Sequence, residues 1–249
     1  MMALFSPNWQ CLSLVLGGLL WITGASVTQA QPAPNVKTAS DTLAVDPSST
    51  VEVENQKGSI TITTWDRDAV GYEVRIEPPA EDSDTPLTSL SVTQTKDELD
   101  LEPDFPWRLQ IPGIITISPG GTERPVLHYT MSIPSSAQLE IDSYASTVEV
   151  SGVAGRIELD TYEADATLSF TALNAPVSID TYSGSVRLTL PSDAGFNLET
   201  DLQSLDQLTA PDAFSLPPPS GDEYEGPVNE GGPLLSIESY SGTIELRVP

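Results

Sequence analysis

The chain has 249 residues and a formal net charge of −26, because 36 acidic side chains face only 10 basic ones. Such a surface repels nucleic acid and anionic lipid headgroups, which argues against proteins that bind either. The only cysteine is Cys11, so the chain cannot form an internal disulfide.

The first 30 residues contain no Asp, Glu, Lys or Arg. An apolar run over Cys11–Thr23 is followed by small residues that end at Ala30, a pattern typical of a cleaved signal peptide. An uncleaved membrane anchor is the competing interpretation, although the run is shorter than the roughly 20 residues of a spanning helix. We therefore expect a signal peptide at 1–30 and an exported protein, which is periplasmic, displayed on the cell surface or secreted.

Residues 31–48 are rich in Pro, Ala, Ser and Thr and are predicted to be a linker. Strand patterns then follow one another, separated by clusters of turn-forming residues. No segment longer than a turn or two has helical periodicity, so the sequence predicts one all-β domain over 49–249. The predicted strands before the repeats are Val51–Glu54, Ser59–Thr64, Val70–Ile76, Leu87–Thr95, Glu98–Leu101, Ile114–Ile117 and Val126–Ile133.

Four segments share one pattern: alternating apolar residues, an acid, Ser or Thr, Tyr, a short turn, then alternating apolar residues again. Short repeats of this kind cannot bury an apolar face alone and must stack on their neighbours. We expect a single-domain β-solenoid of stacked rungs, right-handed like other parallel crossovers. The four segments are Leu139–Val150, Ile157–Leu168, Val177–Leu188 and Leu235–Leu246, with weaker copies at Val51–Ile62 and Phe196–Leu205.

An acid occupies the same place in all six copies, at Glu54, Asp142, Asp160, Asp180, Glu199 and Glu238. Because side chains alternate along a strand, the acid in each of the four closest copies shares the outward face with the tyrosine two residues later. One interpretation is a structural ladder, in which stacked rings shield the backbone while Ser143, Thr161, Thr181 and Ser239 pack near the corner. The other is a ligand-binding strip, in which aromatic faces contact sugar rings or apolar side chains and carboxylates accept hydrogen bonds. The candidate strip consists of Tyr144, Tyr162, Tyr182, Tyr240, Asp142, Asp160, Asp180 and Glu238.

Residues 206–233 interrupt the repeats with Pro217–Pro219, a Gly231–Gly232 pair and six acids without a base. This composition is typical of segments that cannot bury enough apolar surface to fold. The sequence predicts a flexible, acidic, Pro-rich insertion that lies outside the stack.

The residues argue against an enzyme. His128 is the only histidine, and phosphate loops, paired CxxC motifs and HExxH are absent. Asp142, Asp160 and Asp180 would lie about 5 Å apart on stacked strands, near the spacing of a retaining glycosidase pair. Such enzymes place their two acids in different environments, whereas here the setting repeats in every rung. No DxDxDG-type calcium loop is present, and we expect no cofactor and no metal site.

The motifs resemble the putative-adhesin β-strand-repeat family of exported bacterial proteins, a domain of unknown function. The resemblance rests on Gly58–Ile62 followed by Thr64–Asp66, on Met131–Pro134 before the repeats, on the Tyr-Ser-Gly corners, and on Leu190-Pro191 before Phe196. It covers about residues 45–249 and implies a β-solenoid.

We therefore expect a non-enzymatic module of the cell envelope or surface, of the adhesion or scaffold type, that binds a glycan or another envelope protein. A periplasmic sensor or regulatory partner in envelope signalling is the alternative. A polysaccharide-active β-helix enzyme is the third hypothesis.

Overall fold

The computed structural model describes residues 36–78, 89–104, 109–111, 114–117 and 124–249. All of them belong to one unit, Pro34–Pro249. Within these ranges the chain forms strands and a single 3-10 turn, η1 (Leu205–Gln207), so the prediction of an all-β protein is confirmed. The predicted signal peptide at 1–30 lies outside the described residues.

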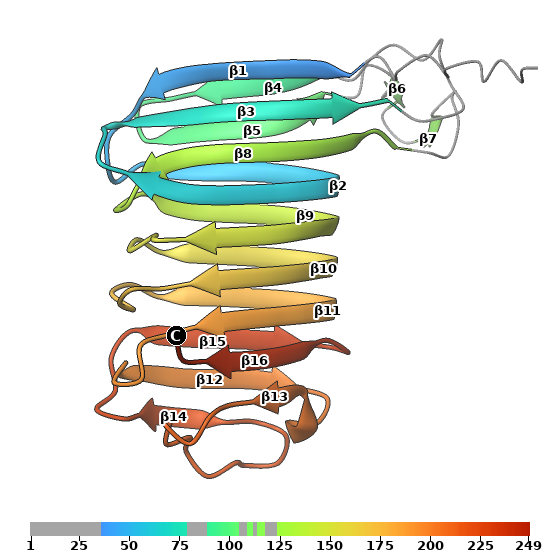
Figure 1. Ribbon diagram of the computed structural model, residues 1–249. Coiled ribbons are helices and arrows are strands. Elements are labelled where there is room, and N and C mark those ends of the chain that lie inside the picture. The colour runs from blue at the N-terminus through green and yellow to red at the C-terminus, as the bar shows by residue number, and fades with distance from the viewer. Residues whose placement is uncertain (1–35, 79–88, 105–108, 112–113, 118–123) are drawn as a thin grey trace, which may run out of the picture. The chain divides into compact units, whose positions relative to one another are not determined.

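The centre of the unit is a β-solenoid-like stack of parallel strands in register. Each long strand bends at a corner, so that both of its halves pair with the rungs on either side. Figure 1 shows these rungs lying one beneath the other. The strands that form them are β2 (Thr50–Trp65), β9 (Gln138–Ser151), β10 (Ile157–Ser169) and β11 (Val177–Thr189), followed by the two-strand rung of β15 (Leu234–Ser239) and β16 (Thr243–Arg247).

The order of the rungs differs from the order of the chain at both ends. The rung of β15 and β16 pairs directly with β11, although β12 (Phe196–Leu202) and β13 (Leu208–Thr209) precede it in sequence. These two strands lie on its far side (Figure 1). At the other end, β5 (Glu98–Asp104) and β8 (Val126–Pro134) pair with the outer edge of β2.

Antiparallel strands close both ends of the stack. At one end β1 (Lys37–Ala44), β3 (Ala69–Glu77) and β8 pair in that order, and β4 (Ser89–Gln94) pairs with β5. At the other end β14 (Glu225–Val228) pairs with β12. Repeat stacks need such caps because an unpaired edge offers hydrogen-bonding groups to other chains. A separate two-stranded sheet joins β6 (Leu109–Ile111) and β7 (Ile114–Ile117).

The interpretation of residues 31–48 as a linker is wrong for 37–44, which form β1 in register with β3. The small and hydroxyl-bearing residues there suit an edge strand that is exposed on most of its length.

The core lies between the two halves of the rungs, where alternate side chains point inward. One column contains Val51, Leu139, Ile157, Val177 and Leu235, which the register aligns rung upon rung. Each of them is at most 1% exposed. Burying an aliphatic side chain of this size contributes about 1.5–3 kcal/mol, so repeated columns replace the disulfides that the chain lacks.

The prediction that residues 206–233 lie outside the stack is wrong. Phe214 is 3% exposed and Val228 is fully buried, both within the core cluster. The Phe214 ring meets Phe196 edge-on at a centroid distance of 5.9 Å, and Val228 lies opposite Phe196 in the β12–β14 ladder. The segment therefore covers the apolar end of the stack and serves as its cap.

Candidate functional site

Four tyrosines form one continuous row on the outside of the stack. The rings of Tyr144, Tyr162, Tyr182 and Tyr240 follow one another with centroid distances of 4.8, 4.6 and 4.9 Å. Adjacent ring planes differ by 4–8°, so every pair is stacked. The predicted alignment of the tyrosines is confirmed, and it extends to Tyr240 because β15 lies next to β11.

The corner that follows each tyrosine fixes the direction of the row. Ser183 Oγ donates to the carbonyl of Tyr162, and Ser241 Oγ donates to the carbonyl of Tyr182 at 2.9 Å. Gly184, at the same corner, has a φ of +106°, a conformation that glycine adopts readily. These contacts hold the backbone on either side of the rings, so the row is built into the rungs.

The rings are exposed, but their faces are largely directed at one another. The exposed fractions are 49% for Tyr144, 40% for Tyr162, 43% for Tyr182 and 56% for Tyr240. Because Tyr162 and Tyr182 each have a ring on both faces, the strip presents mainly ring edges and hydroxyl groups to solvent. This disfavours the expected stacking of sugar rings on the inner tyrosines.

A row of carboxylates runs parallel to the tyrosines. The register aligns Glu54, Asp142, Asp160, Asp180 and Glu238 rung upon rung. The next rung supplies Asp201, which lies opposite Glu238. The assignment of Glu199 to this row is wrong, since Glu199 pairs with Ser236. A shift of two residues keeps the side chain on the same face, so alternation alone could not distinguish Glu199 from Asp201.

The serine and threonine between each acid and tyrosine point inward, as the ladder interpretation expects. Ser143, Thr161, Thr181 and Ser239 are at most 6% exposed. Thr181 Oγ1 donates to the carbonyl of Ser183 at 3.0 Å, and Ser239 Oγ accepts the N–H of Gly242 at 3.1 Å. The corner is therefore polar inside and aromatic outside.

Crowding of like charges is visible in the acid row. Partial burial and the neighbouring Asp160 raise the pKa of both Asp142 and Asp180 above the usual 3.8. A carboxyl whose pKa is raised in the folded state binds its proton more tightly there than in the unfolded chain. It therefore contributes stability at low pH that is lost as the pH rises through the folded pKa.

We expect Asp160→Asn to stabilise the protein by about 0.5–1 kcal/mol at pH 7, because like charges directly opposite each other on adjacent strands are destabilising. The gain should shrink as the pH falls toward 4, where the neighbouring carboxyls of the wild type become protonated. Urea denaturation of both proteins between pH 4 and 7 measures the difference. A variant that is less stable than the wild type at pH 7 would show that Asp160 has a stabilising partner.

Three carboxylates at one end of the row come close enough to share a cation. One ligand oxygen each from Glu52, Glu54 and Asp142 lies within 4.8 Å of the others. Exposed acids often gather without binding a metal. The row of carboxylates also repeats in the same setting from rung to rung, so this end of the row is not distinct from the rest. We therefore assign no metal site to it.

A serine–histidine pair that the sequence did not indicate lies on the other face of the rungs. Ser59 Oγ is 2.9 Å from His128 Nδ1, and His128 Nε2 is 3.9 Å from Glu77 Oε1. The latter distance is too long for a hydrogen bond, and Glu77 pairs with Arg75. Ser59 also has paired strands on both sides, which commits nearby backbone N–H groups to the ladder. The pair thus lacks an oriented acid and an oxyanion hole.

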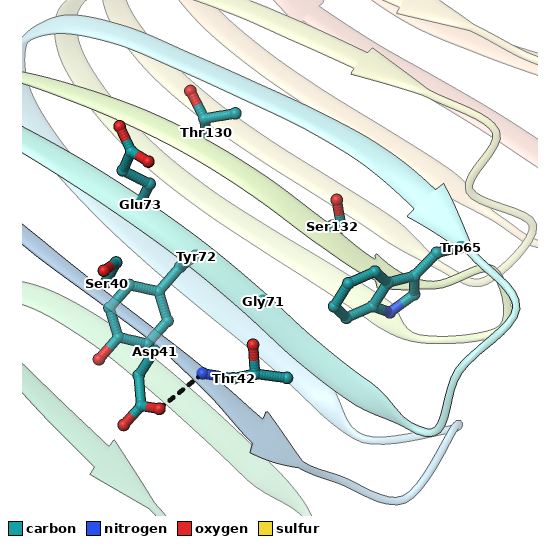
Figure 2. Close-up of a pocket in the computed structure, with 9 residues that line it drawn as sticks. All are labelled: Ser40, Asp41, Thr42, Trp65, Gly71, Tyr72, Glu73, Thr130 and Ser132. Atoms are coloured by element: carbon teal, nitrogen blue, oxygen red, sulfur yellow. Dashed lines mark hydrogen bonds between the residues drawn. The ribbon is translucent and has the colours of Figure 1, made fainter.

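An open hollow of about 430 Å³ lies on the outer face of the β1–β3–β8 sheet (Figure 2). Sequence analysis missed it because its residues come from four strands that are distant in the chain. Trp65, at the end of β2, provides its aromatic group, whereas the side chain of Tyr72 alternates to the other face of β3 and packs against the core. Its lining residues are Ser40, Asp41, Thr42, Trp65, Gly71, Tyr72, Glu73, Thr130 and Ser132.

In the ranges that the structure describes, no helix is long and apolar enough to cross a bilayer.

Comparison with known proteins gives a family match over part of the chain and a similar fold. The family model described as Toastrack DUF4097 matches residues 130–211. The crystal structure of a putative cell adhesion protein from Clostridium sporogenes ATCC 15579 is similar, with a TM-score of 0.59 at 11% identity, over 86% of this chain and all of that one. A putative adhesin from Bacteroides fragilis NCTC 9343 aligns over 86% of this chain and 97% of its own, with 10% identity and a TM-score of 0.20.

No curated protein matches the chain significantly. At 11% identity, the similarity to the Clostridium structure shows a shared fold alone. The matched segment covers β9 to β12 and so contains three rungs of the tyrosine row. This match supports the resemblance to the putative-adhesin β-strand-repeat family, a family of unknown function, that the motifs predicted.

Proposed function

We propose that this protein is an exported, non-enzymatic adhesion or scaffold module that binds a basic envelope protein through its tyrosine strip. The observation that carries the proposal is the strip itself: four tyrosines, each at least 40% exposed, beside an aligned row of carboxylates. We also propose that the stack is a right-handed β-solenoid, because its parallel rungs are linked by crossovers that are right-handed in nearly all proteins.

Charge favours a basic partner over an acidic or neutral one. The acid row carries a carboxylate in each of six successive rungs, and the protein as a whole has a charge of −26. A surface with one sign of charge attracts partners of the opposite sign and accelerates their encounter. Tyrosine adds contact area at a low cost in side-chain entropy, which is why it is enriched where proteins bind one another.

The regularity of the site favours binding over catalysis. Each rung repeats the same acid and tyrosine, so no carboxylate has the distinct surroundings that an acid–base pair needs. The name of the similar Clostridium structure, a putative cell adhesion protein, agrees with this class of function.

The proposal is tested with lysine-rich peptides, with and without aromatic residues, passed over the immobilised full chain. We expect micromolar binding that weakens as salt increases, and a loss of at least tenfold in Asp160→Asn/Asp180→Asn. The matched control is Asp212→Asn/Asp222→Asn, which removes the same charge from exposed positions in the cap. An equal loss of affinity in the control would show that binding depends only on net charge. That result would contradict the proposal that the strip is the binding site.

A further inference from the structure

The hollow on the β1–β3–β8 sheet combines a held indole with several hydroxyl groups and the carboxylate of Glu73 (Figure 2). We propose that this hollow binds a neutral saccharide, one or two sugar units in size. The site is separate from the tyrosine strip, and the inference does not depend on the function proposed for that strip.

Trp65 is positioned by its own contacts. Its Nε1–H donates to the carbonyl of Ala69 at 2.7 Å, across the turn between β2 and β3. The six-membered ring lies against Gly71, where a Cβ would come within 2.7 Å of Cη2. Any side chain at this position would displace the indole, so glycine allows the ring to lie on the sheet. Arg67 lies over one face of the ring, so the fixed indole offers its edge and its remaining surface to the C–H groups of a sugar.

The polar groups around the indole form two short rows across the sheet. The register aligns Thr42, Gly71 and Ser132 in one row and Ser40, Glu73 and Thr130 in the other. Hydroxyl groups both donate and accept, whereas the carboxylate of Glu73 accepts only. Neighbouring sugar hydroxyls need this mixture of donors and acceptors.

Charge and size narrow the class of ligand. Glu73 is acidic, and none of the nine lining residues is basic. The exposed Arg67 lies over the Trp65 ring, 4.8 Å from its centroid, but it is flanked by Asp66 and Asp68. Such surroundings disfavour uronic and sialic acids. A volume of about 430 Å³ lies at the lower end of the range for small-molecule sites, which fits one or two sugar units.

The test uses the full chain with glucose, galactose, N-acetylglucosamine and glucuronate as probes. Saturation-transfer NMR reports contact, and calorimetric titration gives the affinity. We expect at least one neutral sugar to bind in the millimolar range or more tightly, glucuronate to bind at least tenfold more weakly, and Trp65→Ala to lose at least tenfold in affinity. Absence of transfer to all three neutral sugars would overturn the proposal, as would equal binding by Trp65→Ala.

A second variant tests the hollow even if Trp65→Ala fails to fold. Glu73→Gln changes an exposed side chain and leaves the indole and its contacts in place, and we expect a loss of about threefold or more. Unchanged affinity in Glu73→Gln would overturn the role of this row. Tyr162→Ser, on the strip, should leave sugar binding at the wild-type level. This control separates the hollow from the function proposed above, which the lysine-rich peptides test on their own.

Discussion

Gly184→Ala should destabilise the protein by about 3 kcal/mol or more. Gly184 has a φ of +106°, and a Cβ there would lie 2.0 Å from the carbonyl oxygen of Ala164 on the adjacent rung. Backbone strain of this kind costs of order 1–3 kcal/mol, and a forced shift of packed backbone adds a similar amount. The corner lies between Tyr182 and the core residue Val186, so the shift would disturb both. Urea denaturation followed by circular dichroism measures the loss.

Gly221→Ala is the matched control for this substitution. Gly221 also has a positive φ, +69°, but a Cβ there would meet nothing within 4 Å. The cost of an alanine should therefore be that of the left-handed conformation alone, about 1 kcal/mol. If both variants lost the same stability, the close contact between rungs at Gly184 would add nothing to the cost of the substitution. The comparison thus isolates the close approach of neighbouring rungs from backbone strain.

The rungs and their outward rows could be predicted because each is encoded locally. Alternation fixes which side chains point inward, and equivalent positions of stacked repeats must align. The aligned tyrosines from Tyr144 to Tyr182 follow from these two rules. The order of the rungs does not follow, because near-identical rungs can pair with one another in several orders. Only the structure shows that β15 lies between β11 and β12.

The cap was mispredicted because its apolar residues are isolated. Phe214 and Val228 stand among prolines, glycines and acids, a composition that indicates disorder. Leu208, Phe214 and Val228, with the partly buried Leu216 and Tyr224, nevertheless cover the end of the apolar column that the rungs build. The composition of a segment alone therefore does not show whether the segment packs against a neighbouring apolar surface.

The hollow at Trp65 could not be predicted for a different reason. Trp65 was part of a recognised motif, but its partners in the hollow lie on β1, β3 and β8. The linker prediction for residues 31–48 includes β1, so it omits one wall of the hollow. A site that depends on the pairing of distant strands becomes visible only when that pairing is known.

Tyr162→Ser/Tyr182→Ser should lower the free energy of unfolding by about 1.5–4 kcal/mol while the fold is retained. This double substitution removes all three stacked pairs of the row, and an aromatic pair contributes about 0.5–1.5 kcal/mol beyond the area it buries. The half-exposed rings are not needed to fill the core, so the rungs should still form. Thermal unfolding and circular dichroism measure both effects. An unchanged melting temperature would show that the stacked row contributes no stability.

Tyr162→Phe/Tyr182→Phe separates the stabilising role of the row from its binding role. Phenylalanine keeps the stacked rings and removes only the hydroxyls, so the stability should remain close to that of the wild type. Binding of the lysine-rich peptides should then fall by an intermediate amount, because ring edges and carboxylates remain while the hydroxyl hydrogen bonds are lost. If the serine variant lost stability but bound these peptides as the wild type does, the row would be a structural ladder and the proposed strip would be wrong. If both variants lost affinity in proportion to the groups removed, one row of tyrosines would hold the rungs together and also contact the partner.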